Sequence, residues 1–481
     1  MRYAALVSAL CILALSKVHA QWERDIRLTE NDSASSVAIF AARSIAATGD
    51  FVHVVWTDDA DQYPDPRAQY ARSTDRGLSW ETALPLSSDT FVSFDVSVAA
   101  DSGRVHVAWL DLRSGQPQLY YKNSQDNGAT WSADRWLSDN AREFSGPCIA
   151  TAGPDVHLVW TGLQNDTLRV YHKRSPDYGM SWGADVALST DRDASAFGSV
   201  CALDLLVHVA WYAAPTGAGG EVFYRRSTDR GLTWQPQVQL TGGSVGTGLL
   251  CPQIAASEEL VHIASTHRPV DRQEAVYLRS PNRGESWGAA HRVFSTPGED
   301  VGRATVAADG ENVHFAATLV DSGTTRVHYA VSTNGGLDWD VPGRLSDTGP
   351  SAGVSLALAG NSVYAFWQDS RDGNQEVYFK RNPTGNIGIE EMTNTELQAT
   401  KAGPTMVRGV LLLSPLGTRS ELPGRNSVMS RAALLDAAGR KVLSLVPGPN
   451  DVSGLTPGVY FVLEAQPQAQ AQAVRKVIIQ R

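Results

Sequence analysis

The stretch that decides the fold is Ser73-Thr74-Asp75-Arg76-Gly77-Leu78-Ser79-Trp80, because its pattern, Ser-x-Asp/Asn-x-Gly-x-x-Trp, occurs six times along the chain. The six tryptophans stand 51 to 53 residues apart. A period this regular indicates one supersecondary unit stacked on itself, since a unit of this size cannot bury its apolar faces alone. The conserved offsets are occupied by Asp75, Gly77, Trp80; Asp126, Gly128, Trp131; Asp177, Gly179, Trp182; Asp229, Gly231, Trp234; Asn282, Gly284, Trp287; and Asn334, Gly336, Trp339.

The chemistry of the motif is that of a turn. Ser and Asp or Asn side chains bond nearby backbone N–H groups, and glycine accepts a positive φ. The tryptophan then buries a large apolar area against a neighbouring sheet. We therefore interpret the motif as a structural turn between the third and fourth strands of each unit.

Each unit contains four short runs rich in β-branched and aromatic residues, which predict four antiparallel strands, A to D. Strand B recurs seven times, with histidine at one position in six copies: His53, His106, His157, His208, His262 and His314. The final unit lacks a fourth strand, and the segment 22–29 looks like a strand D without a unit of its own. The sequence thus predicts an all-β fold, a seven-bladed β-propeller closed by an N-terminal strand and followed by a small β-sandwich.

The six histidines occupy one position in different blades. They cannot converge on a single metal ion there, so we interpret them as repeated packing or hydrogen-bonding positions. Cys148, Cys201 and Cys251 are too few for a disulfide framework in a secreted chain, and we expect small buried residues. A Cys148–Cys201 bridge and a metal site are the alternatives.

Composition and termini divide the chain into four parts. Residues 1–20 carry a basic start, an apolar run and a small-residue cleavage site, as a secretory signal peptide does. The propeller is predicted over 21–382, a linker over 383–403 and the sandwich over 404–481. The net charge of −10 argues against nucleic acid as a partner, since phosphate attraction dominates that affinity. No later run is apolar enough for a transmembrane segment.

The tail carries the segments Gly439-Arg440, Asn450-Asp451-Val452, Leu455-Thr456-Pro457-Gly458-Val459-Tyr460 and Lys476 to Arg481. It resembles the C-terminal sorting domain of the type IX secretion system (type A). The resemblance implies a bacterial protein that crosses the outer membrane with that machinery as its partner, and is extracellular or held at the cell surface. Whether the tail is cleaved or anchored stays open.

The repeated turn resembles the Asp box (BNR repeat) of sialidases. In that superfamily three arginines hold the substrate carboxylate, a Tyr–Glu pair supplies the nucleophile and an Asp is the acid/base. The resemblance implies a site on the face opposite the Asp boxes. Arg43, at the start of the first strand A, matches the first arginine. The looser candidates for further carboxylate contacts are Arg303, Arg268, Arg272, Arg113 and Arg371. The acid/base candidates are Asp58, Asp59 and Asp61, whereas no tyrosine opens a late strand A.

Three functions follow as alternatives. The preferred one is a secreted propeller that binds a glycan or protein ligand on the face opposite the Asp boxes. The second is an exo-α-sialidase or related glycoside hydrolase, and the third is a structural surface protein. No cofactor is expected. A calcium site at Asp58, Asp59, Asp61 and Asp65 is a weaker alternative to a solvated acidic loop.

Overall fold

The computed structural model describes residues 22–385 apart from gaps at 31, 39–42, 60–65, 88–90, 139–141, 165–166, 191–192, 216–218, 243–250, 268–273, 295–300 and 322, together with the strands of 405–479. The predicted signal peptide lies outside these residues. The chain forms two compact units, Met1–Glu391 and Met392–Arg481, and this division falls within the predicted linker. Every regular element in the described residues is a strand, so none of them forms a helix that is long and apolar enough to cross a membrane.

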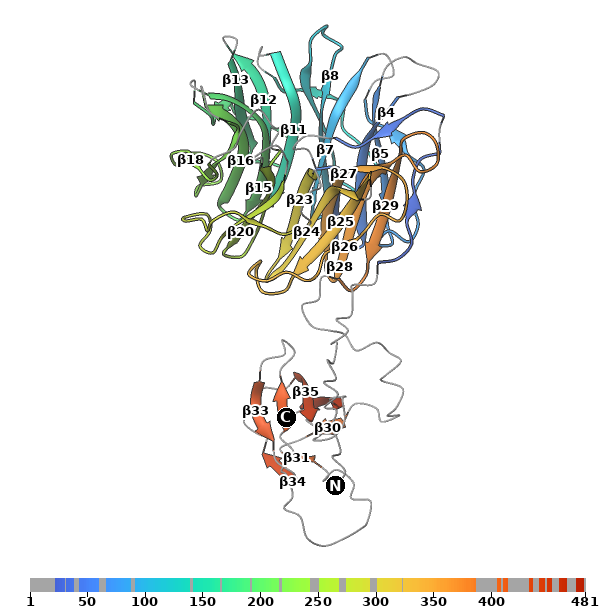
Figure 1. The fold of residues 1–481 in the computed structure, drawn as a ribbon, viewed down its shortest axis with the longest axis vertical. Coiled ribbons are helices and arrows are strands. Elements are labelled where there is room, and N and C mark those ends of the chain that lie inside the picture. Colours follow the sequence, from blue (N-terminus) through green and yellow to red (C-terminus); the bar gives the residue numbers. More distant parts are fainter. Residues whose placement is uncertain are drawn as a thin grey trace, which may run out of the picture. The chain divides into compact units, whose positions relative to one another are not determined.

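The first unit is a seven-bladed β-propeller (Figure 1), as the repeat predicts. Each blade is an antiparallel sheet whose strands follow one another along the chain from the innermost, A, to the outermost, D. The blades are β3 (Ile45–Thr48), β4 (Phe51–Asp58), β5 (Arg67–Ser73), β6 (Leu84–Pro85), with β2 (Ser35–Ser36) also on β4; β7 (Ser93–Asp101), β8 (Arg104–Asp111), β9 (Gln118–Ser124), β10 (Arg135–Trp136); β11 (Arg142–Ala152), β12 (Asp155–Gln164), β13 (Thr167–Ser175), β14 (Val186–Ala187); β15 (Asp193–Leu203), β16 (Leu206–Pro215), β17 (Glu221–Ser227), β18 (Val238–Gln239); β19 (Gln253–Ser257), β20 (Leu260–His267), β21 (Glu274–Ser280), β22 (His291–Arg292); β23 (Val301–Asp309), β24 (Asn312–Asp321), β25 (Thr324–Ser332), β26 (Gly343–Arg344); and β27 (Ser351–Ala359), β28 (Ser362–Asp369), β29 (Glu376–Asn382) with β1 (Ile26–Arg27).

The N-terminal strand closes the ring. Strand β1 pairs antiparallel with β29, with Ile26 opposite Phe379 and Arg27 opposite Tyr378, so it is the missing strand D of the seventh blade. Trp22 packs edge-on against Tyr329 of the sixth blade, with 5.0 Å between the ring centroids. The closure thus gives the seventh blade the fourth strand that its own stretch of chain lacks, and it covers the edge of β29.

The repeated turn is closed by its own side chains. In the first copy, the Ser73 hydroxyl accepts the Gly77 N–H at 2.7 Å, and one Asp75 oxygen accepts the Ser79 N–H at 2.8 Å. The Ser79 hydroxyl donates to the other Asp75 oxygen at 2.5 Å. Asn282 replaces Asp in the fifth copy and still accepts the Ser286 N–H at 2.9 Å. The turn is therefore structural, as its chemistry predicts.

The same turn also joins neighbouring blades. Tyr70 in strand C of the first blade bonds His53 of strand B through its hydroxyl and Nδ1, 2.7 Å apart. Trp131 of the next blade packs edge-on against Tyr70 at 4.9 Å. A Cβ on Gly128 would lie 1.8 Å from the Tyr70 hydroxyl, so only glycine lets the turn sit this close. A histidine–tyrosine pair is thus covered by the glycine and tryptophan of the following turn.

This seam recurs around the ring. The hydrogen-bonded pairs are His53–Tyr70, His106–Tyr121, His157–His172, His208–Tyr224, His262–Tyr277 and His314–Tyr329, and the seventh blade stacks Tyr364 on Phe379. The prediction that the six strand-B histidines are packing and hydrogen-bonding residues is confirmed.

The C-terminal unit is all-β as well. Its strands are β30 (Thr405–Val407), β31 (Val410–Leu413), β32 (Ala432–Leu435), β33 (Lys441–Leu445), β34 (Gly448–Asp451), β35 (Gly458–Glu464) and β36 (Ala473–Ile479). One sheet has the order β30-β36-β35-β32-β33 and the other pairs β31 with β34. Two small sheets, with β36 as the final strand, match the predicted β-sandwich.

Candidate functional site

The inner strands of the seven blades surround a central channel with two different ends. Because each strand A begins after a D–A loop, its start lies on the face of the B–C and D–A loops, which we call the loop face. Its end lies beside the A–B turns and the Asp boxes, on what we call the turn face. Side chains at the start of strand A therefore belong to the loop-face mouth, where the sequence predicts the site.

A β-bulge shapes this mouth. The pairing of strand A with strand B shifts register at its loop-face end in five blades, for example between Phe94 and Ser97 in the second. Asp95 and Phe197 sit in these bulges with φ of 54° and 58°. A bulge re-aims side chains, and non-glycine residues in this backbone region are uncommon and cluster at functional sites.

Beyond the bulge, one position of each inner strand forms a ring of small polar side chains. The register with strand B places Ser44, Ser97, Cys148, Ser199, Gln253, Thr305 and Ser355 at this level. Their hydroxyls link adjacent blades: Ser97 accepts the Arg43 N–H at 3.2 Å and the Ile149 N–H at 3.3 Å. We call this level the hydroxyl ring, because five of its seven side chains carry a hydroxyl group. It separates the loop-face mouth from the rest of the channel.

Arg303 and Asp95 lie on the loop-face side of the hydroxyl ring. The Arg303 guanidinium donates to the Ala38 carbonyl across a blade boundary. Burial lowers the pKa of Arg303 to about 10, while Cys251, Cys148 and Asp95 oppose this effect. Burial raises the pKa of Asp95 to about 6. The Gly146 N–H, which donates to Asp95 at 2.9 Å, and the charge of Arg303 both lower this pKa but do not outweigh burial.

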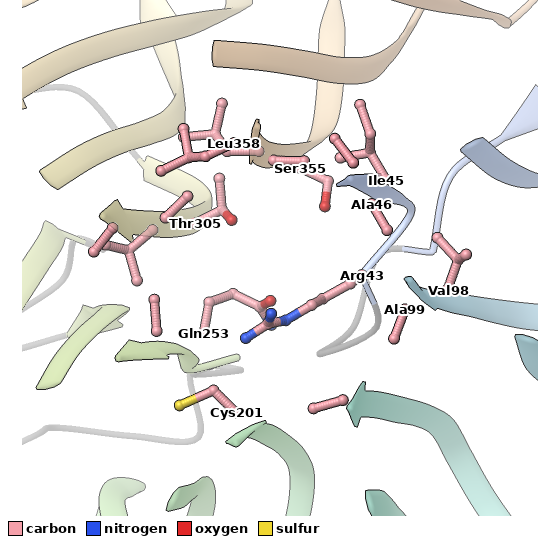
Figure 2. A pocket seen from close by; sticks show the side chains of 18 of the residues that line it. Arg43, Ile45, Ala46, Val98, Ala99, Cys201, Gln253, Thr305, Ser355 and Leu358 are labelled. Carbon is pink, nitrogen blue, oxygen red and sulfur yellow. The ribbon is translucent and has the colours of Figure 1, made fainter. Parts of the chain in front are cut away.

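Arg43 crosses the channel instead of facing the loop-face mouth. Its Nη2 donates to the Ile254 carbonyl of the fifth blade at 2.5 Å. The strand register matches Arg43 with Pro252, so the acceptor lies two residues further towards the turn face. The guanidinium thus lies on the turn-face side of the hydroxyl ring. Figure 2 shows the side chain reaching across the channel towards Gln253.

A cavity of about 240 Å³ occupies the channel on this side. Most of its lining consists of alanine and other apolar residues of the inner strands, and the polar members include Gln253, Thr305, Ser355 and Cys201 (Figure 2). The lining continues to Ala47, the residue before the end of β3. The cavity therefore extends from the Arg43 guanidinium towards the turn face.

The acidic candidates lie at the end of strand B in the first blade. Asp58 accepts a hydrogen bond from the Ser35 hydroxyl at 2.5 Å, and Asp59 is exposed. Partial desolvation by nearby protein atoms and the neighbouring charge of Asp58 raise the pKa of Asp59, although its side chain remains exposed to solvent. Asp61 lies outside the described residues. No hydrogen bond or ion pair between either of the two described acids and Arg43 is present in the described structure, so their catalytic roles stay predictions.

Two of the looser arginine candidates are held by buried carboxylates, and Arg268 and Arg272 lie outside the described residues. Arg113 bonds Asp111 at 2.7 and 2.9 Å, and the fully buried Asp111 also accepts the Trp109 indole N–H at 3.3 Å. In the seventh blade, the Arg371 guanidinium donates to Asp369 at 2.7 Å and to Asp25 at 2.5 Å, and its backbone N–H donates to the other Asp369 oxygen at 2.9 Å. The Trp-x-Asp-x-Arg-x-Gly stretches of these two blades carry a sequence signal for this clamp. A guanidinium clamped in this way is already paired and is a poor ligand for a substrate carboxylate.

The three cysteines are free thiols, as the simpler interpretation predicts, and the alternative Cys148–Cys201 bridge is wrong. Cys148 Sγ lies 3.9 Å from the Ser199 hydroxyl. Burial raises the pKa of Cys201 to about 12, so this thiol is not a nucleophile near neutral pH. Within the described residues, no group of three or more His, Cys, Asp or Glu side chains is placed to hold a metal ion.

Trp136 is an exposed aromatic residue that sequence reasoning did not single out. It lies in β10, close to the loop face, and 53% of it is exposed. Its indole N–H donates to Gln118 at 3.1 Å and to the Ser138 hydroxyl at 2.7 Å, which fixes the ring. Other blades place Pro85, Ala187, Gln239, Arg292, Arg344 or Arg27 at this position. The signal was available, because Trp136 is the only tryptophan in the six motif-bearing units that follows the motif within strand D.

Comparison with known proteins supports the fold. No protein-family model and no curated protein matches the sequence. The structure is similar to an ulvan lyase of polysaccharide lyase family 25 bound to -[GlcA(1-4)Rha3S]-, with 11% identity and a TM-score of 0.52 over 74% of this chain and 95% of that one. A Trypanosoma rangeli sialidase in complex with sialic acid matches at 13% identity and a TM-score of 0.44, over 94% and 88% of the two chains. A protein of unknown function from Dyadobacter fermentans matches at 14% and 0.44, over 61% and 95%. At this identity, the likeness to the lyase shows a shared fold.

Proposed function

We propose that the chain is a binding propeller whose ligand, a glycan or a protein, sits on the loop face. The supporting observation is a comparison of the seven blades with one another. The turn face repeats the same turn six times, whereas the strand-A position two residues before the hydroxyl ring varies over six blades, with glycine in two of them: Asp95, Gly146, Phe197, Cys251, Arg303 and Gly353. Repeated residues satisfy the demands of the ring, so the unrepeated ones are where specificity for a ligand resides.

A glycan is the first class of ligand to test. Trp136 presents a ring that two hydrogen bonds hold in place and that no other blade repeats. A rigid, exposed aromatic ring suits the apolar face of a sugar and loses little side-chain entropy on binding. The ulvan lyase was solved with a bound oligosaccharide, which adds an acidic polysaccharide to the panel of ligands.

The test uses the full chain on an array of sialylated, neutral and uronic-acid glycans, followed by calorimetry of the hits. Trp136→Ala should weaken binding at least about tenfold, or roughly 1.4 kcal/mol. Leu232→Ala is the matched control, because Leu232 is 67% exposed on the turn face and should not affect binding. Unchanged affinity in Trp136→Ala would exclude this ring. No bound glycan at all would reject the glycan version and leave a protein ligand or a structural role.

An exo-α-sialidase is the alternative that Arg43 and Arg303 favour, because both place a guanidinium in the channel. Against it, both donate to backbone carbonyls, and in the described residues no inner strand begins with a tyrosine. Turnover of a fluorogenic sialoside separates the two functions. Release of the fluorophore that Arg43→Ala abolishes would replace the binding proposal with the enzyme.

We also propose that the protein is exported and that its C-terminal unit is the sorting signal. The support is the apolar start at 4–15 and the tail motifs around Tyr460. Mass spectrometry of the culture medium, the outer membrane and the cell interior of the producing bacterium would test this. Removal of 404–481 should retain the propeller inside the cell, and unchanged export would contradict the proposal.

A further inference from the structure

The channel cavity on the turn-face side of the hydroxyl ring contains one charge. In the described residues that line it, Arg43 is the only ionisable side chain apart from the Cys201 thiol. One of its N–H groups is used by the Ile254 carbonyl, and no carboxylate is paired with it in the described structure. A guanidinium among apolar walls is costly unless a counter-charge or several hydrogen bonds satisfy it.

The other channel charges do not supply this counter-charge. Arg303 and Asp95 lie beyond the hydroxyl ring, where Arg303 donates to Ala38 and Asp95 accepts from Gly146. Two inner strands end in aspartates at the turn face, Asp101 and Asp309, each one residue beyond a lining residue (Ala100 and Ala308). Arg43, which is partly buried, is therefore the charged side chain within the cavity lining itself, and an anion that enters the cavity would meet its guanidinium.

The walls then restrict the kind of anion. A volume of about 240 Å³ is below the roughly 300–1,000 Å³ of pockets for drug-sized ligands. Ala46, Ala99 and Leu358 present apolar groups, whereas Thr305 and Ser355 supply hydroxyl donors near the hydroxyl ring (Figure 2). The planar fork of an arginine matches a carboxylate better than it matches a spherical ion.

We propose that this cavity is a binding site for a small monocarboxylate, with the carboxylate on Arg43 and a short apolar tail pointing towards the turn face. The site lies on the turn-face side of the hydroxyl ring, so failure of the glycan experiment leaves it untouched, whereas sialoside turnover that Arg43→Ala abolishes would contradict it. A bound carboxylate would also explain why the long, charged side chain of Arg43 lies in a channel that is otherwise lined mostly by alanine.

The test measures binding of carbon-13-labelled sodium propionate to the full chain by NMR, with melting temperature as a second readout and sodium chloride at equal ionic strength as the comparison. Propionate should bind saturably up to tens of millimolar and raise the melting temperature, whereas chloride should do neither. Equal stabilisation by chloride, or no saturable binding of propionate, would overturn the proposal.

Three variants locate the site. Arg43→Gln should weaken propionate binding more than tenfold, because it removes the charge. Ala46→Leu fills the cavity and leaves Arg43 in place, so it should abolish binding even if Arg43→Gln folds poorly. Arg76→Gln is the control, since Arg76 is 61% exposed on the same face and bonds Asp50. Binding that survives Ala46→Leu, or that falls equally in Arg76→Gln, would place the anion elsewhere and refute the site.

Discussion

Acid should destabilise the propeller through its blade seams, well above the pH at which carboxylates titrate. Burial lowers the pKa of His53 to about 3, with help from the charge of Arg72. His157, His208 and His262 behave in the same way, and the pKa of His106 falls to about 4. The unfolded chain should protonate these side chains near about pH 6.5. The neutral form is favoured in the fold, so stability is complete above about pH 6.5 and is lost as the pH falls towards the folded values.

The size of the effect follows from the separation of the two pKa values. Between about pH 8 and about pH 5, a histidine with a folded pKa near 3 should cost about 2 kcal/mol of unfolding free energy. Five such residues would cost on the order of 10 kcal/mol if they were additive, which rivals the total stability of a domain. Asp95 acts in the opposite direction, because its pKa is raised to about 6. Its protonation in the fold should raise the unfolding free energy by only about 1.4 kcal/mol between about pH 8 and about pH 5.

The seventh blade supplies the matched control, since it places Tyr364 and Phe379 where other blades place histidine and tyrosine. The double variant His53→Tyr/Tyr70→Phe copies that pair into the first blade. Urea unfolding followed by tryptophan fluorescence at several pH values should show a steep fall in stability for the natural chain. The double variant should lose about 2 kcal/mol less between about pH 8 and about pH 5. The reasoning fails if stability is flat over this range, or if the variant shows the same acid loss.

Three further predictions concern the ring itself. Gly128→Ala should destabilise the fold by several kcal/mol on urea unfolding, because the new Cβ would overlap the Tyr70 side chain. The control is Gly115→Ala, which has the same kind of positive φ in open space and should cost only about 1–2 kcal/mol. Equal costs for the two variants would refute the packing of the turn against Tyr70. Asp126→Ala removes three turn hydrogen bonds and should cost about 1–2 kcal/mol by the same measurement, so a neutral result would contradict a structural turn. Deletion of 22–29 exposes the outer edge of β29, and size-exclusion chromatography should show aggregation that an intact seventh blade prevents; a stable monomer would show that closure is dispensable.

The sequence was sufficient for the ring because the signals that build it are local and repeated. The turn around Asp75 is closed by residues within four positions of one another, so its spacing predicts its structure directly. The orphan strand at Ile26–Arg27 could be placed because only one unit lacked its fourth strand. The seam partners were also readable in principle, since the strand-B histidine and the strand-C tyrosine recur 15 to 17 residues apart.

The candidate site was less predictable, because it depends on the direction in which side chains point rather than on the spacing of residues in the sequence. Arg43 was predicted at the start of the first inner strand and lies two residues before β3, but its pattern does not say which end of the channel the side chain enters. That choice depends on Ile254, a residue 211 positions away whose carbonyl accepts its hydrogen bond. Asp95 was missed for a similar reason. Its raised pKa and positive φ come from a bulge and from burial by other blades, which no short segment encodes.

In a closed repeat, the residues that stabilise the ring are different from the residues that would give specificity for a ligand. Positions that recur, such as Gly128 with Tyr70, touch the next blade, and a change there breaks a seam on which the whole ring depends. Positions that do not recur, such as Trp136, sit where a single blade meets solvent, and a surface change of this kind usually costs little stability. Arg43 combines the two classes, because its backbone N–H supports the hydroxyl ring while its side chain appears in no other blade. Its substitution by Gln keeps the first contact and removes the second, which makes Arg43→Gln the variant that can report on the channel without dismantling the propeller.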